Sequence, residues 1–185
     1  MIVIINTINQ FDQKIILYTY EHLRTPLLDN VMRFFTRIGD GFVIWIIICL
    51  ILMISKKYRR VGIIASIVLL INTILGEVVL KNLIERVRPY EALNLKIIIK
   101  ELSSFSMPSG HALSSFSIAF VVTSLIKQWK IYMPILILAI IIGLSRIYLS
   151  VHYPTDVLLS ILIAYIVSSI VIRIAKHKKF IQNRQ

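Results

Sequence analysis

Long apolar runs constrain the fold of this chain more than any other feature of its sequence. A helix rises about 1.5 Å per residue, so a full crossing of a bilayer takes about 20 residues. In lipid, runs of this length favour helix over strand, because a helix satisfies its own backbone hydrogen bonds. The chain has five such runs, of which the first and third are short and need their flanks: residues 41–55, 61–80, 111–125, 131–150 and 155–172.

Composition points to the same class of protein. Hydrophobic residues make up 57% of the chain and charged residues only 16%, with a mean hydropathy of +0.81. That profile is typical of polytopic membrane proteins. The sequence therefore predicts an all-α fold, a polytopic transmembrane helix bundle with five to six spanning helices. The length allows one domain, residues 1–185. It divides into interfacial N-terminal helices (1–40), a catalytic helix bundle (41–174) and a basic cytoplasmic tail (175–185).

The first forty residues differ from the rest. Residues 8–23 and 26–38 each have the pattern of a short amphipathic helix, and Pro26 between them suits a helix start. We expect both helices to lie in the outer membrane interface against the bundle, with a sixth span near the start as the alternative. The segment carries too many charges for lipid-exposed spans: Asp12, Lys14, Glu21, Asp29, Arg33 and Arg37.

The net charge of +12 does not indicate nucleic-acid binding, because the basic residues fall in short runs between apolar segments. If all five runs span, three basic clusters share one side, which the positive-inside rule makes cytoplasmic. The candidate site residues then all face the extracytoplasmic side of a cell membrane. The three clusters are residues 56–60, residues 127–130 and the C-terminal tail.

The first candidate site cluster follows the second apolar run. Lys81 and Arg88 lie just beyond its end, and Pro89 ends the helix there. Arg offers a planar fork for phosphate oxygens, and Lys a point charge. Glu77, four residues before Lys81, suits a neutralising partner. Arg86 would face about 160° away from Arg88 on a continuing helix, so we exclude it from the predicted site.

Two more clusters introduce later helices. In Pro108-Ser109-Gly110-His111, Ser109 suits an N-cap and Gly110 lets the backbone approach a ligand, where free N–H groups bind anions. The third cluster holds Ser145-Arg146 and then His152 and Asp156. Arg146 follows a long uncharged run, where an arginine is costly without a role. Asp156 lies one turn from His152, so its carboxylate can accept a hydrogen bond from Nδ1–H and leave Nε2 free as a nucleophile.

Together these clusters resemble the type 2 phosphatidic acid phosphatase (PAP2) family, which shares its site with vanadium haloperoxidases. The family pattern is K-x6-R-P, then P-S-G-H, then S-R-x5-H-x3-D, and all three occur here in order with that spacing. The resemblance covers roughly residues 28–174. Leu28-Asp29, Thr36 and Gly39 look like the family's weaker N-terminal pattern. The short N-terminus is a departure from the family, and the expected number of spanning helices is therefore five to six.

The resemblance implies a metal-independent hydrolase, a membrane lipid phosphatase with a phosphohistidine intermediate, no cofactor and no obligatory protein partner. His152 would attack phosphorus, Asp156 would orient His152, and His111 would protonate the leaving alkoxide and then help activate water. No carboxylate cluster suited to Mg²⁺ accompanies the motifs. The phosphate oxygens would be held by Lys81, Arg88, Arg146 and the backbone near Ser109 and Gly110.

The substrate should be a lipid phosphate from the bilayer. Phosphatidic acid and phosphatidylglycerol phosphate are favoured slightly by the P-S-G-H form, and undecaprenyl diphosphate is the alternative. A lipid phosphotransferase is a further alternative to a hydrolase. The remaining alternative, a non-catalytic membrane transporter, would place ionisable residues at mid-membrane, whereas here they gather at one face.

Overall fold

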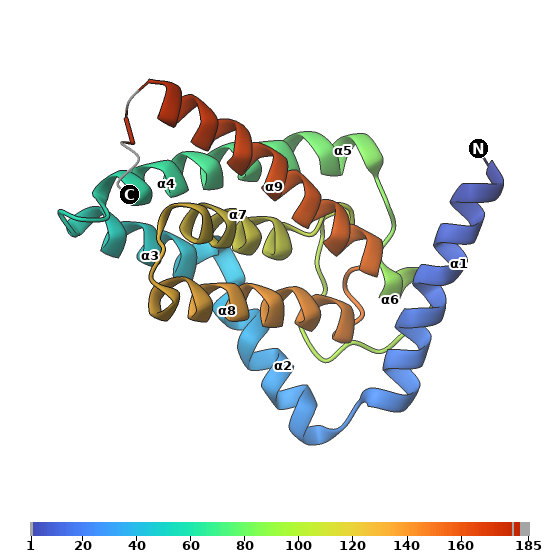
Figure 1. The fold of residues 1–185 in the computed structure, drawn as a ribbon. Coiled ribbons are helices and arrows are strands. Elements are labelled where there is room, and N and C mark those ends of the chain that lie inside the picture. Colours follow the sequence, from blue (N-terminus) through green and yellow to red (C-terminus); the bar gives the residue numbers. More distant parts are fainter. Residues whose placement is uncertain (1, 179, 182–185) are drawn as a thin grey trace.

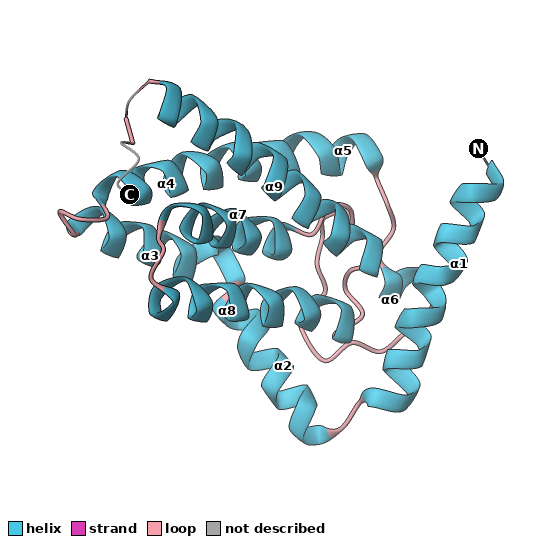
Figure 2. Cartoon of the chain, viewed as in Figure 1, coloured by secondary structure: helices cyan, strands magenta, loops and turns pink. Residues whose placement is uncertain are grey.

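The computed structural model describes residues 2–178 and 180–181, and this part of the chain is helical without any strand. The apolar runs form helices that lie side by side in one bundle (Figures 1 and 2). The predicted all-α bundle is confirmed. The bundle consists of α3 (Val43–Ile54), α4 (Arg59–Thr73), which continues into α5 (Lys81–Ile84), α7 (Gly110–Leu125), α8 (Trp129–Tyr148) and α9 (Pro154–His177).

The helix α7 lies at the centre, because α4, α8 and α9 all pack against it. Several of its buried side chains are small, and two serine hydroxyls donate to its own backbone: Ser115 to the His111 carbonyl and Ser117 to the Leu113 carbonyl, each at 2.6 Å. Small residues let neighbouring helices approach closely in a membrane bundle. The site at the start of α7 is therefore held by helices on several sides.

Among the described residues, three helical segments are long and apolar enough to cross a membrane by themselves: residues 59–92, α8 and α9. The helix α2 (Pro26–Ile38) and residues 40–54 pass the same test only together, as a pair bent by 47°. The helix α7, with 16 residues, is apolar but shorter than a full crossing. The structure thus supports a multi-pass membrane protein, with a bent segment where α2 meets α3.

The N-terminal segment forms two helices on the expected sides of Pro26. The helix α1 (Ile2–Tyr18), extended by one π-helical turn to Leu23, crosses the end of the bundle instead of running alongside it (Figure 1). The helix α2 begins at Pro26, with the Thr25 hydroxyl accepting from the Leu28 N–H, and packs against α8. Both helices reach the end of the bundle where α9 begins.

The segment between α4 and α6 (Pro89–Ala92) sets the direction of several site residues. A π-helical stretch, Ile74–Leu80, interrupts the long helix, a device frequent at functional sites. The helix then stops at Ile84, because Glu85 adopts a left-handed conformation with φ of 49°. Beyond this point the chain crosses the end of the bundle, over a small second core that includes Tyr90, Tyr148 and Val151.

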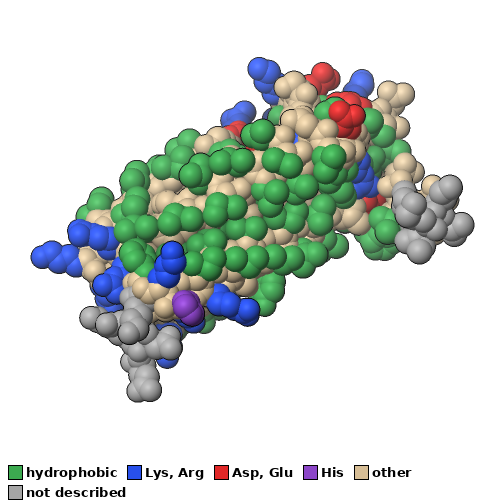
Figure 3. Space-filling model, turned by 90° about the horizontal axis from the view of Figure 1, so that it is seen from above, with side chains coloured by type: hydrophobic (Ala, Val, Ile, Leu, Met, Phe, Trp, Pro, Cys, Tyr) green, Lys and Arg blue, Asp and Glu red, His purple; other side chains and the backbone are tan. Residues whose placement is uncertain are grey.

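Charge is distributed unevenly along the bundle. Figure 3 shows a broad apolar band between two charged ends. One end carries the basic turns between α3 and α4 and between α7 and α8, near the end of α9. The other end carries α1, α6 and the starts of α7 and α9, with charges of both signs. The candidate site lies at this second end.

Candidate active site

The predicted site residues converge from four helices and two loops. A cavity of about 170 Å³ is lined by six of them, and the other two, Ser109 and Asp156, are buried close behind it. The lining from the predicted set is Lys81, Arg88, Gly110, His111, Arg146 and His152; Gly41, Phe42, Glu77, Leu102 and Ser104 complete it.

The hydrogen bonds around His152 define its tautomer. Nδ1 lies 2.6 Å from the Ser106 carbonyl, which can only accept, so Nδ1 carries the proton. Nε2 lies 3.3 Å from Nη1 of Arg88, which can only donate, so Nε2 presents its lone pair. Burial, with the charges of Arg88 and Arg146, lowers the pKa of His152 well below its usual range, against the opposing effect of Asp156. An unprotonated nitrogen therefore faces the cavity.

Asp156 supports His152 differently from what the sequence indicated. Its Oδ2 is 3.8 Å from Nδ1 of His152, too far for the expected direct hydrogen bond, which goes to the Ser106 carbonyl instead. The physical reason is that Asp156 caps α9: Oδ2 accepts from the Tyr153 N–H at 2.8 Å and from the Ser106 hydroxyl at 2.5 Å. The carboxylate remains within ion-pair distance, so it favours positive charge on the ring.

Two buried arginines face the cavity without a carboxylate partner. Arg88 donates to the carbonyls of Ser104, Phe105 and Val151 at 2.6 to 3.1 Å, so its plane is fixed. Arg146 is 1% exposed and donates from Nη1 to the Thr36 hydroxyl, while its Nε has no hydrogen-bond partner. Within the described residues, neither guanidinium forms an ion pair. Unpaired buried charge is costly, so the cavity is suited to an anion.

The third cation, Lys81, has the expected partner. Its Nζ lies 2.9 Å from Oε2 of Glu77 and 3.2 Å from the Ser104 hydroxyl. Glu77 in turn lies against the first residue of α7, since a Cβ built on Gly110 would fall 2.0 Å from its Oε1. Ser109 caps α7, accepting from the Ala112 N–H at 3.4 Å. The start of α7 therefore lies against Glu77, the partner of Lys81, and free N–H groups at a helix start are suited to anions.

The second histidine is held by a residue that sequence reasoning missed. Nε2 of His111 lies 2.9 Å from Oδ1 of Asp40, in the turn between α2 and α3. Asp40 is 62% exposed at its side chain and belongs to none of the three motifs. The neighbouring Gly39 is needed for close approach, because a Cβ there would meet Cδ2 of His111 at 2.8 Å. The only sequence signal for Asp40 was its place in a polar turn between an amphipathic helix and an apolar helix.

The weaker N-terminal pattern also reaches the site end. Thr36 binds Arg146, as described above, and Asp29 accepts from the Tyr148 hydroxyl at 2.7 Å. Arg24 pairs with the same carboxylate at 3.3 Å. The helix α2 is therefore attached to the end of α8 next to Arg146.

Arg86 does not line the cavity, but it contacts Asp156 behind it, because the helix does not continue to residue 86 as expected. Because the helix ends at Ile84, the Arg86 side chain turns back, and its Nη1 binds Oδ1 of Asp156 at 2.6 Å. The expected angle of about 160° between Arg86 and Arg88 is wrong, because the left-handed residue Glu85 breaks the helix before both of them. The sequence carries no proline or glycine at this break.

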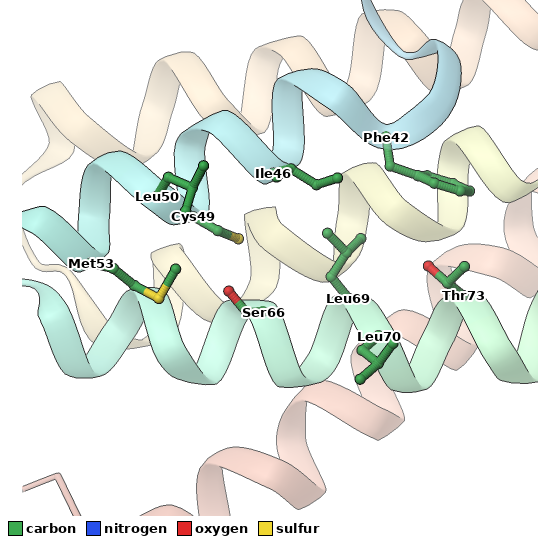
Figure 4. Close-up of a pocket in the computed structure, with 9 residues that line it drawn as sticks. All are labelled: Phe42, Ile46, Cys49, Leu50, Met53, Ser66, Leu69, Leu70 and Thr73. Carbon is green, nitrogen blue, oxygen red and sulfur yellow. The ribbon is translucent and has the colours of Figure 1, made fainter.

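A separate apolar cavity of about 330 Å³ lies between α3 and α4 (Figure 4). It is lined by Phe42, Ile46, Cys49, Leu50, Met53, Ser66, Leu69, Leu70 and Thr73. Phe42 belongs to the lining of both cavities, so the apolar one meets the polar one at this side chain. Among the residues that the structure describes, no three His, Cys, Asp or Glu side chains are grouped closely enough to hold a metal ion.

Comparison with known proteins agrees with this geometry. The family model described as the PAP2 superfamily matches residues 60–180. The chain belongs to the PAP2 superfamily. It is 33% identical over 145 residues to the undecaprenyl-diphosphatase of Sulfolobus acidocaldarius, covering 77% of this chain and 67% of the relative. It is also 33% identical over 147 residues to phosphatidylglycerophosphatase B of Bacillus subtilis, covering 74% and 70%.

A solved PAP2 structure shows the same fold. The transmembrane phosphatidylglycerolphosphate phosphatase of Bacillus subtilis superposes with a TM-score of 0.75 at 26% identity, covering 97% of this chain and 90% of that one. The similarity therefore extends through the N-terminal helices as well as through the three PAP2 motifs.

Proposed function

We propose that this protein is an integral membrane lipid phosphatase that works through a phosphohistidine intermediate without a metal ion. One observation carries the proposal: two buried guanidiniums without carboxylate partners share a cavity with the unprotonated Nε2 of His152. A phosphoryl group supplies the missing negative charge, and an imidazole lone pair is a suitable nucleophile toward it.

The residues divide the reaction between them. Nε2 of His152 attacks phosphorus in line and forms the P–N bond, while the bond from phosphorus to the lipid oxygen breaks. His111 gives a proton to that oxygen and then takes one from water, which attacks phosphorus, breaks the P–N bond and releases inorganic phosphate. Arg88, Arg146 and Lys81 stabilise the charge on the equatorial oxygens in both transition states. Asp156 stabilises the positive charge that forms on the His152 ring, and Asp40 orients His111.

The apolar cavity supports a substrate with a hydrocarbon tail. It runs between α3 and α4 and meets the polar cavity at Phe42, so a headgroup bound near His152 leaves its tail at the apolar side (Figure 4). We place the substrate in the phosphatidic acid and phosphatidylglycerol phosphate type. Undecaprenyl diphosphate is the second candidate, favoured by the name of the Sulfolobus relative. Transfer of the phosphoryl group to a second lipid instead of water is a further alternative.

The orientation in a cell membrane follows from the basic turns. They lie at the end of the bundle opposite the cavity, and basic loops favour the cytoplasmic side. The active site then faces the extracytoplasmic side, where α1 and α2 lie in the interface.

Phosphate release from purified protein in detergent tests the function. The substrates are phosphatidic acid, phosphatidylglycerol phosphate and a polyprenyl diphosphate, each assayed with EDTA present. Release of phosphate from at least one of them, undiminished by EDTA and absent in His152→Ala, supports the proposal. Complete loss in EDTA that Mg²⁺ restores would overturn the metal-free mechanism, and the appearance of a newly phosphorylated lipid would indicate phosphotransfer.

A further inference from the structure

Asp12 is a fully buried carboxylate on α1, a helix that lies outside the bundle. It binds the start of α9, accepting from the Thr155 N–H at 3.1 Å and from the Thr155 hydroxyl. Its Oδ2 also lies 2.6 Å from Nη2 of Arg86. Burial of a carboxylate is costly unless a cation joins it, so Asp12 and Arg86 depend on each other.

Arg86 lies between two buried carboxylates. Besides Asp12, it binds Oδ1 of Asp156 at 2.6 Å through Nη1, which also donates to the Thr155 hydroxyl at 2.8 Å. Its guanidinium carbon lies 4.0 Å from the ring centroid of Tyr153, and its side chain is 16% exposed. One positive charge therefore balances two carboxylates that are both 0% exposed.

The backbone of Arg86 supports the same histidine by a second route. The Arg86 carbonyl accepts from the Ser106 N–H at 2.8 Å. The Ser106 carbonyl in turn takes the proton of Nδ1 of His152, and the Ser106 hydroxyl binds Asp156. Arg86 thus holds both groups that contact the proton-bearing side of His152.

We infer that Arg86, anchored by Asp12 of α1, is a positioning residue that holds the Asp156 carboxylate behind the nucleophilic His152. The inference rests on the proposed function of His152. Without the guanidinium, the buried carboxylates of Asp12 and Asp156 both lose the cation that pairs with them, and Oδ1 of Asp156 loses the donor that fixes it. Two negative charges that Arg86 no longer balances favour the protonated ring of His152. The acid limb of activity therefore moves to higher pH.

Three variants test this role in the full chain in detergent: Arg86→Gln, Arg86→Lys and the double variant Arg86→Gln with Asp12→Asn. Arg24→Gln is the matched control, since Arg24 is 17% exposed at its side chain and pairs with Asp29 at the same end of the protein. We expect Arg86→Gln to lower kcat about 10- to 100-fold with KM little changed, as when a supporting hydrogen bond behind a functional histidine is removed. The acid limb of its pH–activity profile moves to higher pH. In the double variant this limb moves back toward its native position, and in Arg86→Lys it stays at the native position.

A second readout is independent of turnover. Diethyl pyrocarbonate reacts with neutral imidazole and not with protonated imidazole. The rate at which it modifies His152 is followed by mass spectrometry at several pH values. In Arg86→Gln the pH dependence of this rate should shift to higher pH, as the acid limb of activity does. An acid limb that stays unchanged in Arg86→Gln would show that Arg86 is merely structural. So would an equal loss of activity at every pH that the double variant does not recover. If the native chain releases phosphate from none of the lipids, the proposed function fails, and the modification rates still decide the role of Arg86.

Discussion

Nε2 of His152 lies 3.3 Å from Nη1 of Arg88, and this contact allows only one protonation state of the ring. A guanidinium donates and never accepts, so Nε2 must be unprotonated whenever the contact forms. The same Arg88 is fixed by three backbone carbonyls and faces the cavity. Nucleophile and phosphate ligand are therefore held side by side by the fold before any substrate binds.

This geometry predicts that His152→Ala abolishes turnover for every substrate. No other described group in the cavity is placed to form the covalent intermediate, apart from His111, which is paired with Asp40. A ³²P-labelled lipid phosphate should give the native protein an acid-labile label, and this label should be absent in His152→Ala. His22→Ala is the control, because His22 is exposed and distant in sequence from all three motifs. Labelling that persists in His152→Ala would place the nucleophile elsewhere.

The low pKa of His152 has a measurable consequence with a definite sign. Burial and the two neighbouring guanidiniums disfavour the charged ring, so protonation requires a pH below its ordinary value of about 6.5. The rate of modification of His152 by diethyl pyrocarbonate should therefore stay constant as the pH falls through 6.5 and decline only below it. The exposed His22 is the internal reference in the same spectra. A decline of the His152 rate centred above pH 6.5 would contradict this prediction.

Arg146 should be more important for activity than for stability. Its buried Nε has no hydrogen-bond partner among the described residues, so Arg146→Met removes a costly charge as well as one hydrogen bond to Thr36. We expect Arg146→Met to lower activity about 100- to 1,000-fold, the range for loss of one transition-state donor. The melting temperature in detergent should be unchanged or raised, and phosphate should no longer increase it. The exposed Arg173→Met is the control; a large loss of stability with retained activity would refute the assignment.

Gly110 and Gly143 offer a matched pair of substitutions. A Cβ at Gly110 would lie 2.0 Å from Oε1 of Glu77, whereas a Cβ at Gly143 would meet Phe116 at 3.4 Å, an ordinary contact. Gly110→Ala should displace Glu77 from Lys81 and narrow the cavity, raising KM and lowering kcat, while Gly143→Ala should have little effect. Adding Glu77→Ala to Gly110→Ala removes the clash, so the KM of the double variant should be lower than that of Gly110→Ala and closer to the native value. Equal kinetics for the two single alanine variants would contradict the close contact.

The three clusters could be predicted because local rules place their members. Ser109 caps α7, Pro154 starts α9 and Asp156 caps that helix, so short spacings in sequence become short distances. The spacing of four residues similarly placed Glu77 beside Lys81, although Glu77 lies in the π-helical stretch. The apolar runs predicted the helices of the bundle for a similar local reason, because each run in lipid satisfies its backbone hydrogen bonds within its own helix.

Residues that act across the fold escaped prediction. Asp40, Ser106 and Asp12 reach the two histidines or Asp156 from turns and from α1, and no periodicity links them to the motifs. Arg86 was misplaced because a single left-handed residue, Glu85, ended a helix that carries no proline or glycine at that point. Long-range packing, which a local pattern does not encode, decides where such residues lie.

The last prediction separates the two histidines by leaving group. His111, held by Asp40, lies in the same cavity as His152 and is the proposed acid. His111→Ala should slow the first step most for phosphatidic acid, whose alkoxide leaves poorly without a proton. The loss should be smaller for a diphosphate or an aryl phosphate. General acid catalysis is typically worth about 10²- to 10⁴-fold, so the two classes should differ measurably in single-turnover rates. Asp40→Asn should show a weaker form of the same pattern, because it keeps the ring's contact but loses the charge. Equal damage to both leaving-group classes, with chemistry rate-limiting, would make His111 a phosphate ligand and not the acid.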